Sequence, residues 1–195
     1  MLNAVGREIP QEVLDETGKT VFQGTYQFDQ HEYTKAPVKA RTRIGGSGSK
    51  LESSIQEVLQ KCNAHDGMTI SFHHHFREGD LVVMQVMNVI HELGYKDITI
   101  CASSLSKAQD DLVPMIEDGT VTHIETSGVR GKIGEAISSG KLKGIAILRS
   151  HGGRVRAIET GETKIDIAFI GSPSCDEYGN CRGVGGNSNC GVLSY

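Results

Sequence analysis

The sequence predicts an α/β fold with an open, mainly parallel β-sheet and crossover helices. Short apolar runs recur roughly every twenty residues, with helix-like segments between them, as in a βαβ ladder. The runs are residues 68–72, 98–102, 121–125, 145–148 and 165–170. Connections of this length make neighbouring strands parallel and right-handed. The carboxyl ends of all five strands should therefore meet at one edge, where open α/β sheets bind ligands.

The first helix is expected to begin at Ser49, with Glu52 three residues later completing a capping box. Apolar residues follow at helical spacing and are expected to face inward. They are Leu51, Ile55, Val58, Leu59 and Cys62.

Two further helices are expected between the apolar runs. Residues 81–93 are apolar on most faces, with Asp80 placed to cap the helix and Gly94 to end it. This helix should be buried against the sheet. Residues 131–139 have apolar residues on one side and stop at Gly140, so they can form another crossover.

A length of 195 residues suits one well-buried core. Residues 1–43 carry Gly, Pro and charged residues at irregular intervals. This pattern predicts an N-terminal arm of extended or edge elements that lies over the α/β domain of residues 44–195.

The net charge of −4 gives no basic field for nucleic acid, and no sustained apolar stretch suggests a secretory signal or a membrane segment. We therefore expect a cytoplasmic protein whose five cysteines are free thiols.

Small, polar or basic residues follow each predicted strand. The candidate site residues are His73, His74, His75, Arg77, Ser103, Ser104, Ser127, Gly128, Ser150, His151, Gly152, Gly153 and Arg154. Ser and Gly are common wherever a chain turns, so one such loop would carry little weight. Together with residues 171–174, which follow the last strand, these make five loops at one edge. Their hydroxyls, backbone amides and cations favour a site for a carboxylate or a phosphate.

The three consecutive histidines suggest a metal site at first sight. On an extended backbone, successive side chains point to opposite faces, so only His73 and His75 could share an ion. We expect no metal and instead expect the histidines to polarise a developing oxyanion or a substrate carboxylate. Residues 45–50 resemble a nucleotide phosphate loop, but Leu51 stands where Ser or Thr is required, which argues against ATP binding.

Residues 165–180, IDIAFIGSPSCDEYGN, resemble the strand and Ala-Asp-x-x-Gly-Asn turn of the coenzyme A transferase superfamily, which shares a sugar-phosphate isomerase-like fold; here Cys175 replaces the usual Ala. Three more stretches are similar to the citrate lyase α subunit family. They are residues 69–77 (TISFHHHFR), 124–131 (IETSGVRG) and 148–158 (LRSHGGRVRAI). Residues 6–10 and 188–195 are similar to that family as well, so the resemblance covers essentially the whole chain.

The resemblance implies an acyl transferase that exchanges acetate for citrate on the acetyl thioester of an acyl carrier subunit. The implied partners are citrate, acetate, the β (lyase) subunit and the γ (carrier) subunit, whose arm derives from coenzyme A; no tightly bound cofactor is expected in this chain. Arg130 and Arg154 are candidates for clamping citrate carboxylates, with help from Ser127, Ser150 and His151.

Two departures from the family pattern limit the resemblance. Residues 71–77 occupy the position of the loop that supplies the oxyanion hole in related coenzyme A transferases, with histidines in place of glycines. The Ser-Glu-Asn-Gly motif that carries the attacking glutamate of ordinary coenzyme A transferases is missing, and family members are much longer. We therefore expect a first coenzyme A transferase-like domain, truncated before a second similar one, that is inactive alone. Two alternatives stay open: a coenzyme A transferase for another short acid, and a non-catalytic ligand-sensing domain of the same superfamily.

Overall fold

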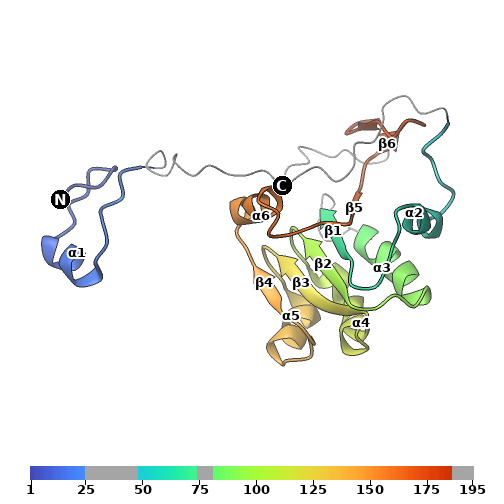
Figure 1. The fold of residues 1–195 in the computed structure, drawn as a ribbon, viewed down its shortest axis with the longest axis horizontal. Helices are drawn as coiled ribbons and strands as arrows, with labels where there is room; N and C mark the ends of the chain where they lie inside the picture. The colour runs from blue at the N-terminus through green and yellow to red at the C-terminus, as the bar shows by residue number, and fades with distance from the viewer. Residues whose placement is uncertain (25–47, 74–80, 186–195) are drawn as a thin grey trace. The chain divides into compact units, whose positions relative to one another are not determined.

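The computed structural model describes residues 1–24, 48–73 and 81–185 (Figure 1). The chain divides into two compact units, Met1–Lys35 and Ala36–Tyr195. The smaller unit contains helix α1 (Gln11–Thr17), which buries Leu14 and ends at Gly18 in the left-handed region, with φ of 62°. The extended or edge elements predicted there were wrong over α1, whose carboxyl end is fixed by a glycine C-cap. The boundary at residue 43 stays a prediction.

The larger unit is built on a five-stranded parallel sheet, as the sequence predicts. Its strands are β1 (Thr69–His73), β2 (Ile98–Ala102), β3 (Val121–Thr126), β4 (Ala146–Leu148) and β5 (Ile167–Ile170). Their order in the sheet is β4-β3-β2-β1-β5, with every neighbouring pair parallel. A separate antiparallel pair follows, β6 (Ser174–Cys175) with β7 (Cys181–Arg182).

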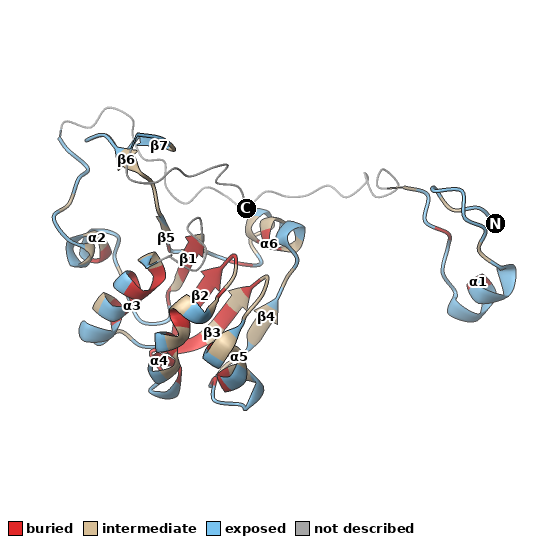
Figure 2. Ribbon diagram, turned by 180° about the vertical axis from the view of Figure 1, so that it is seen from behind, coloured by how far each residue is buried: buried red, intermediate tan, exposed pale blue. Residues whose placement is uncertain are grey.

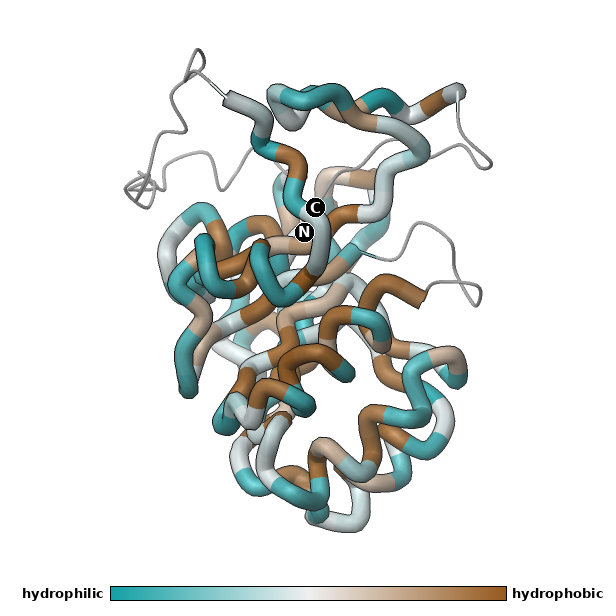
Figure 3. The backbone as a smooth tube through the Cα atoms, turned by 90° about the vertical axis from the view of Figure 1, so that its right-hand side faces the viewer, coloured by the Kyte–Doolittle hydropathy of each residue, from teal (hydrophilic) through white to brown (hydrophobic). Residues whose placement is uncertain are grey.

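Helices cover both faces of the sheet (Figure 2). One face carries α3 (Val82–Glu92), the turn η3 (Lys107–Leu112), α4 (Val113–Glu117) and α5 (Gly131–Ser138); α6 (His151–Glu159) packs on the other. In Figure 3, apolar segments run through the interior of this unit, and the turns around it are hydrophilic. Within the described residues, no helix has the length and apolar character needed to cross a membrane.

The core lies between the sheet and the first of these helix layers. Ile70, Ile100 and Ile124 of the three central strands are fully buried, as are Met87 of α3 and Ile116 of α4. Burying a side chain of this size contributes about 1.5–3 kcal/mol. The apolar residues alternate with polar ones along the central strands, so the opposite face of the sheet is the polar one.

Helix α2 (Ile55–Lys61) begins later than the sequence predicts. Its N-cap is Ser54, whose hydroxyl accepts a hydrogen bond from the Glu57 amide at 3.2 Å. The predicted start at Ser49 was therefore wrong, and Glu52 forms an ion pair with Lys61 at 2.6 Å instead of a capping box. As a result Leu51 and Cys62 are exposed, and of the predicted inward residues only Leu59 is fully buried.

Helix α3 ends as predicted. Gly94 has φ of 81° and donates a hydrogen bond to the His91 carbonyl at 3.0 Å, and the amide of Tyr95 bonds the Ile90 carbonyl at 3.2 Å. This is the pattern of a Schellman motif, which needs a residue in the left-handed region. The predicted cap, Asp80, lies outside the described residues. The helix expected over residues 131–139 is also confirmed, as α5.

The order of the strands creates a change of direction at β1. From β1 the chain moves outward through β2, β3 and β4, and then α6 returns it to β5 on the other side of β1. Because right-handed crossovers running in opposite directions place their helices on opposite faces, α6 lies apart from α3, α4 and α5. In open α/β sheets, ligands bind beyond the carboxyl ends of the strands at such a change of direction.

Candidate functional site

The loops after β2 and β3 lie side by side at the carboxyl edge of the sheet. The Ser127 amide bonds the Ser103 carbonyl at 3.2 Å, and the Leu105 amide bonds the Gly128 carbonyl at 2.9 Å. These bonds bring together the predicted residues of the two loops, including Ser104. Ser103 is fully buried, whereas the Ser127 hydroxyl is a buried oxygen without a hydrogen-bond partner among the described residues. A buried polar atom of this kind calls for a partner, such as a ligand or water.

Arg130 stands at the N-cap of α5 with an exposed side chain. The amino end of this helix is already neutralised, because the Asp110 carboxylate accepts a hydrogen bond from the Lys132 amide at 2.8 Å. Gly131, with φ of 70°, permits this approach, since a Cβ there would lie 2.5 Å from Asp110 Oδ1. An anionic ligand at this edge can therefore use the Arg130 side chain but not the α5 amides.

The predicted loop at residues 150–154 is the first turn of helix α6. Ser150 is its N-cap, and its hydroxyl accepts a hydrogen bond from the Gly153 amide at 3.1 Å. The loop prediction was wrong because paired glycines weaken the local helical signal, whereas packing against the sheet stabilises the helix. Ser150, His151 and Gly152 are exposed, and they present the positive end of the helix dipole just beyond β4.

Arg154 is the buried member of this turn, with only 4% of its surface exposed. Its guanidinium donates hydrogen bonds to Ser71 Oγ on β1 at 2.9 Å and to Cys101 Sγ on β2 at 2.7 Å. Burial raises the pKa of the Cys101 thiol, and the Arg154 charge only partly opposes that rise. Arg154 therefore faces the sheet and ties α6 to strands β1 and β2. Arg130, in contrast, is exposed.

A second polar network lies beside Arg154 and was not foreseen from the sequence. Glu125 on β3 accepts hydrogen bonds from the Thr163 hydroxyl at 2.5 Å and from Arg149 Nε at 3.4 Å. Arg149 also forms an ion pair with Glu162 at 3.0 Å. These contacts fix the connection from α6 to β5 against the polar face of the sheet.

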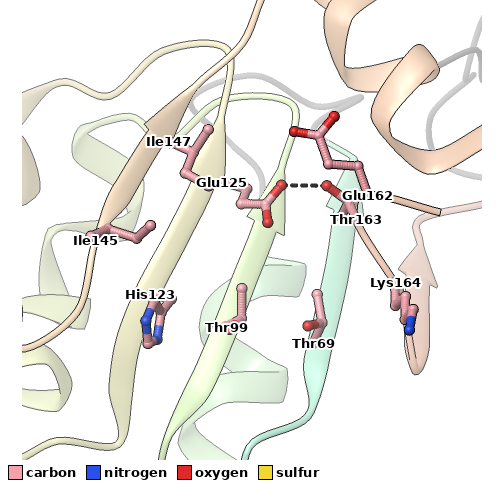
Figure 4. A pocket seen from close by; sticks show the side chains of 9 residues that line it. All are labelled: Thr69, Thr99, His123, Glu125, Ile145, Ile147, Glu162, Thr163 and Lys164. Atoms are coloured by element: carbon pink, nitrogen blue, oxygen red, sulfur yellow. Dashed lines mark hydrogen bonds between the residues drawn. The ribbon is translucent and has the colours of Figure 1, made fainter. Parts of the chain in front are cut away.

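A groove of about 370 Å³ runs along the polar face towards the amino ends of the strands (Figure 4). It is lined by Thr69, Thr99, His123, Glu125, Ile145, Ile147, Glu162, Thr163 and Lys164. Thr69, Thr99 and His123 are register partners on adjacent strands and form a row across the sheet. The groove contains none of the predicted site residues. Polar residues at every second position of β1 and β3 were the signal that could have found it.

His73 ends β1, half-buried, beside Ile170 of β5. The other predicted members of its loop, His74, His75 and Arg77, lie outside the described residues. The structure thus gathers two groups of predicted residues at the carboxyl edge: the paired loops after β2 and β3, and the amino end of α6. Their hydroxyls, backbone amides and exposed cation can bind a carboxylate.

Comparisons with known proteins agree on one family. The model of the family "citrate lyase, alpha subunit (CitF)" matches residues 48–195. The citrate lyase alpha chain of Haemophilus influenzae is 44% identical over 170 residues, which are 87% of this chain and 34% of the relative. That of Escherichia coli is 48% identical over 157 residues, 80% of this chain and 30% of the relative. The chain thus spans about a third of the length of these relatives.

A solved structure supports the same assignment. The putative alpha subunit of citrate lyase from Streptococcus mutans, described as a complex with citrate, is 43% identical and superimposes with a TM-score of 0.80. The match covers 98% of this chain and 36% of that one. Since the family model matches most of the sequence and the fold agrees, the chain belongs to the citrate lyase alpha subunit family.

Proposed function

We propose that this chain is the citrate-binding part of an acyl transferase. In the proposed reaction, citrate replaces acetate on the acetyl thioester of an acyl carrier protein, giving the citryl carrier and free acetate. The observation that carries the proposal is the match over 98% of the chain to the Streptococcus mutans subunit in complex with citrate. A fold shared at 43% identity supports a shared ligand.

The carboxyl edge of the sheet supplies groups suited to a tricarboxylate. The amino end of α6 offers amides and a positive dipole, Ser127 offers a buried hydroxyl, and Arg130 offers an exposed guanidinium. In this proposal His73, His74 and His75 polarise the carbonyl under attack, and Arg77 holds a further carboxylate. Citrate would bridge the two groups of residues at this edge.

We assign the arm that carries the thioester to the γ (carrier) subunit and not to this chain. The coenzyme A-derived group arrives on the γ (carrier) subunit as a substrate, and the β (lyase) subunit cleaves the citryl product. The four cysteines of the described residues are all free thiols. Free thiols are common in reducing compartments, which supports a cytoplasmic location.

Radiolabelled citrate exchange tests the proposal. A protein with the full length of the relatives, incubated with acetyl-carrier and labelled citrate, should form labelled citryl-carrier and release acetate. Short monocarboxylates offered in place of citrate should be poor acceptors. Preference for such an acid would overturn the proposal in favour of another coenzyme A transferase, and citrate binding without exchange would favour a ligand sensor.

A further inference from the structure

The β6–β7 hairpin places two cysteines directly opposite each other. Cys175 and Cys181 are register partners in the antiparallel pair. The Asp176 amide bonds the Asn180 carbonyl at 3.0 Å, so the cysteines occupy a non-hydrogen-bonded position of the ladder. At such positions the Cα atoms stand about 4.5 Å apart, with the side chains close together. That spacing is within the range that a disulfide spans.

The turn between the cysteines is held firmly. The Asp176 carboxylate accepts hydrogen bonds from the Asn180 side chain at 2.8 Å and from the amides of Tyr178 and Asn180, both at 2.9 Å. These bonds, led by that from the Asn180 side chain, lower the pKa of Asp176. Gly179, with φ of 82°, closes the turn by bonding the Asp176 carbonyl at 3.1 Å. The two thiols are therefore kept in register before any bond forms between them.

Exposure distinguishes this pair from Cys101. Cys175 and Cys181 are both exposed free thiols, open to a dissolved oxidant. Cys101 is buried beneath Arg154, and burial raises the pKa of its thiol, which disfavours the reactive thiolate. Cys62 is exposed at the end of α2, and no other cysteine of the described residues pairs with it in a strand register, which makes it a matched control.

We propose that Cys175 and Cys181 form a dithiol site that a peroxide converts reversibly into an intrachain disulfide. The thiolate of one cysteine attacks a peroxide oxygen, giving a sulfenic acid and one water molecule from hydrogen peroxide. The second thiol then attacks the sulfenic sulfur, forming the S–S bond and releasing a second water molecule. Overall, the two thiols together lose two electrons and the peroxide gains them. A small dithiol reduces the disulfide back to the two thiols.

Peptide mass spectrometry tests this directly. Trypsin cleavage after Lys164 and Arg182 places both cysteines in one peptide, residues 165–182. After treatment with hydrogen peroxide and then iodoacetamide, this peptide should be two hydrogens lighter and carry no alkyl group. Dithiothreitol added before iodoacetamide should restore alkylation at both positions. Cys175→Ser and Cys181→Ser should each abolish the mass loss, and Cys62→Ser should leave it unchanged.

Three outcomes would overturn the proposal. The first is full alkylation of residues 165–182 after peroxide treatment. The second is a crosslink from either cysteine to the peptide that contains Cys190. The third is sulfinic acid at one cysteine in place of a disulfide. All are visible in the same digest, and the site is distinct from the candidate citrate site, so the exchange assay does not bear on the result.

Discussion

The guanidinium of Arg154 lies 2.9 Å from the hydroxyl of Ser71, which links the first turn of α6 to the central strand β1. Ser71 precedes His73 by two residues on the same face of the strand. The same guanidinium bonds Cys101 on β2. One buried side chain therefore fixes the amino end of α6 relative to the strand that leads into the histidine loop.

Removing this contact should destabilise the fold. Arg154→Ala leaves Ser71 and Cys101 without their partner in a buried place and should cost about 3 kcal/mol of unfolding free energy. Urea denaturation measures the change. Arg156→Ala is the matched control, because Arg156 is exposed and its ion pair with Glu162 is long, at 3.6 Å. Equal midpoints for the two variants would contradict a structural role for Arg154.

Ser150 should combine a capping role with a binding role. Ser150→Ala removes the N-cap hydrogen bond and should lower stability by about 1 kcal/mol. Ser150→Asp keeps a good N-cap and should fold normally, but its charge should repel a carboxylate and weaken citrate binding by at least about tenfold, near 1.4 kcal/mol. Calorimetry measures the affinity. If Ser150→Asp binds citrate as the unmodified chain does, the ligand lies elsewhere.

Gly152 should be dispensable for folding but needed for the approach of the ligand. A Cβ at Gly152 meets no atom within 4 Å, so Gly152→Ala should raise stability by up to about 1 kcal/mol. The added methyl should weaken citrate binding by obstructing the α6 amides. Gly153→Ala is the contrasting variant, since its Cβ would lie 3.0 Å from Ser150 Oγ and disturb the cap. Unchanged citrate affinity in Gly152→Ala would show that these amides do not contact citrate.

Asp118 should make stability depend on pH in the acid range. Burial alone raises the pKa of this carboxyl, but hydrogen bonds from Thr120, Lys96 and His91 outweigh burial and hold the pKa well below its ordinary value. A depressed pKa stabilises the fold above the ordinary carboxyl range, and this contribution is lost as pH falls towards the folded-state pKa.

Thermal unfolding at several pH values checks this expectation. Asp118→Asn should lower the melting temperature at pH 7, and its difference from the unmodified chain should shrink below about pH 4. Asp111→Asn alters an exposed carboxylate and serves as the control, with little effect at either pH. A difference for Asp118→Asn that stays constant from pH 7 to pH 3 would contradict the assignment.

The 195-residue chain alone should bind citrate but should not catalyse the exchange. It spans about a third of its relatives, and it lacks the Ser-Glu-Asn-Gly motif that supplies the attacking glutamate in ordinary coenzyme A transferases. Acetyl-carrier and labelled citrate should therefore give no citryl-carrier with this chain alone. Measurable exchange by the isolated chain would show that these residues hold a complete site.

Local sequence determined the elements of the sheet and several of their ends. The bounds of strands β1 to β5 agree with those of the predicted apolar runs to within two residues. The agreement arises because a strand that is buried in the sheet needs apolar residues at neighbouring positions of the sequence. The end of α3 was equally clear, since Gly94 adopts a conformation that other residues rarely take. The polar loops at the carboxyl ends of the strands followed from the parallel arrangement.

Only the tertiary structure decided what the individual side chains do. Arg154 has the sequence context of a loop cation, but its partners Ser71 and Cys101 lie 83 and 53 residues away. The role of Asp110 at the amino end of α5 likewise depends on a contact between residues 22 positions apart. The amino-acid pattern encodes which face of an element is apolar, whereas the pairing of polar groups depends on which elements the folded sheet brings together.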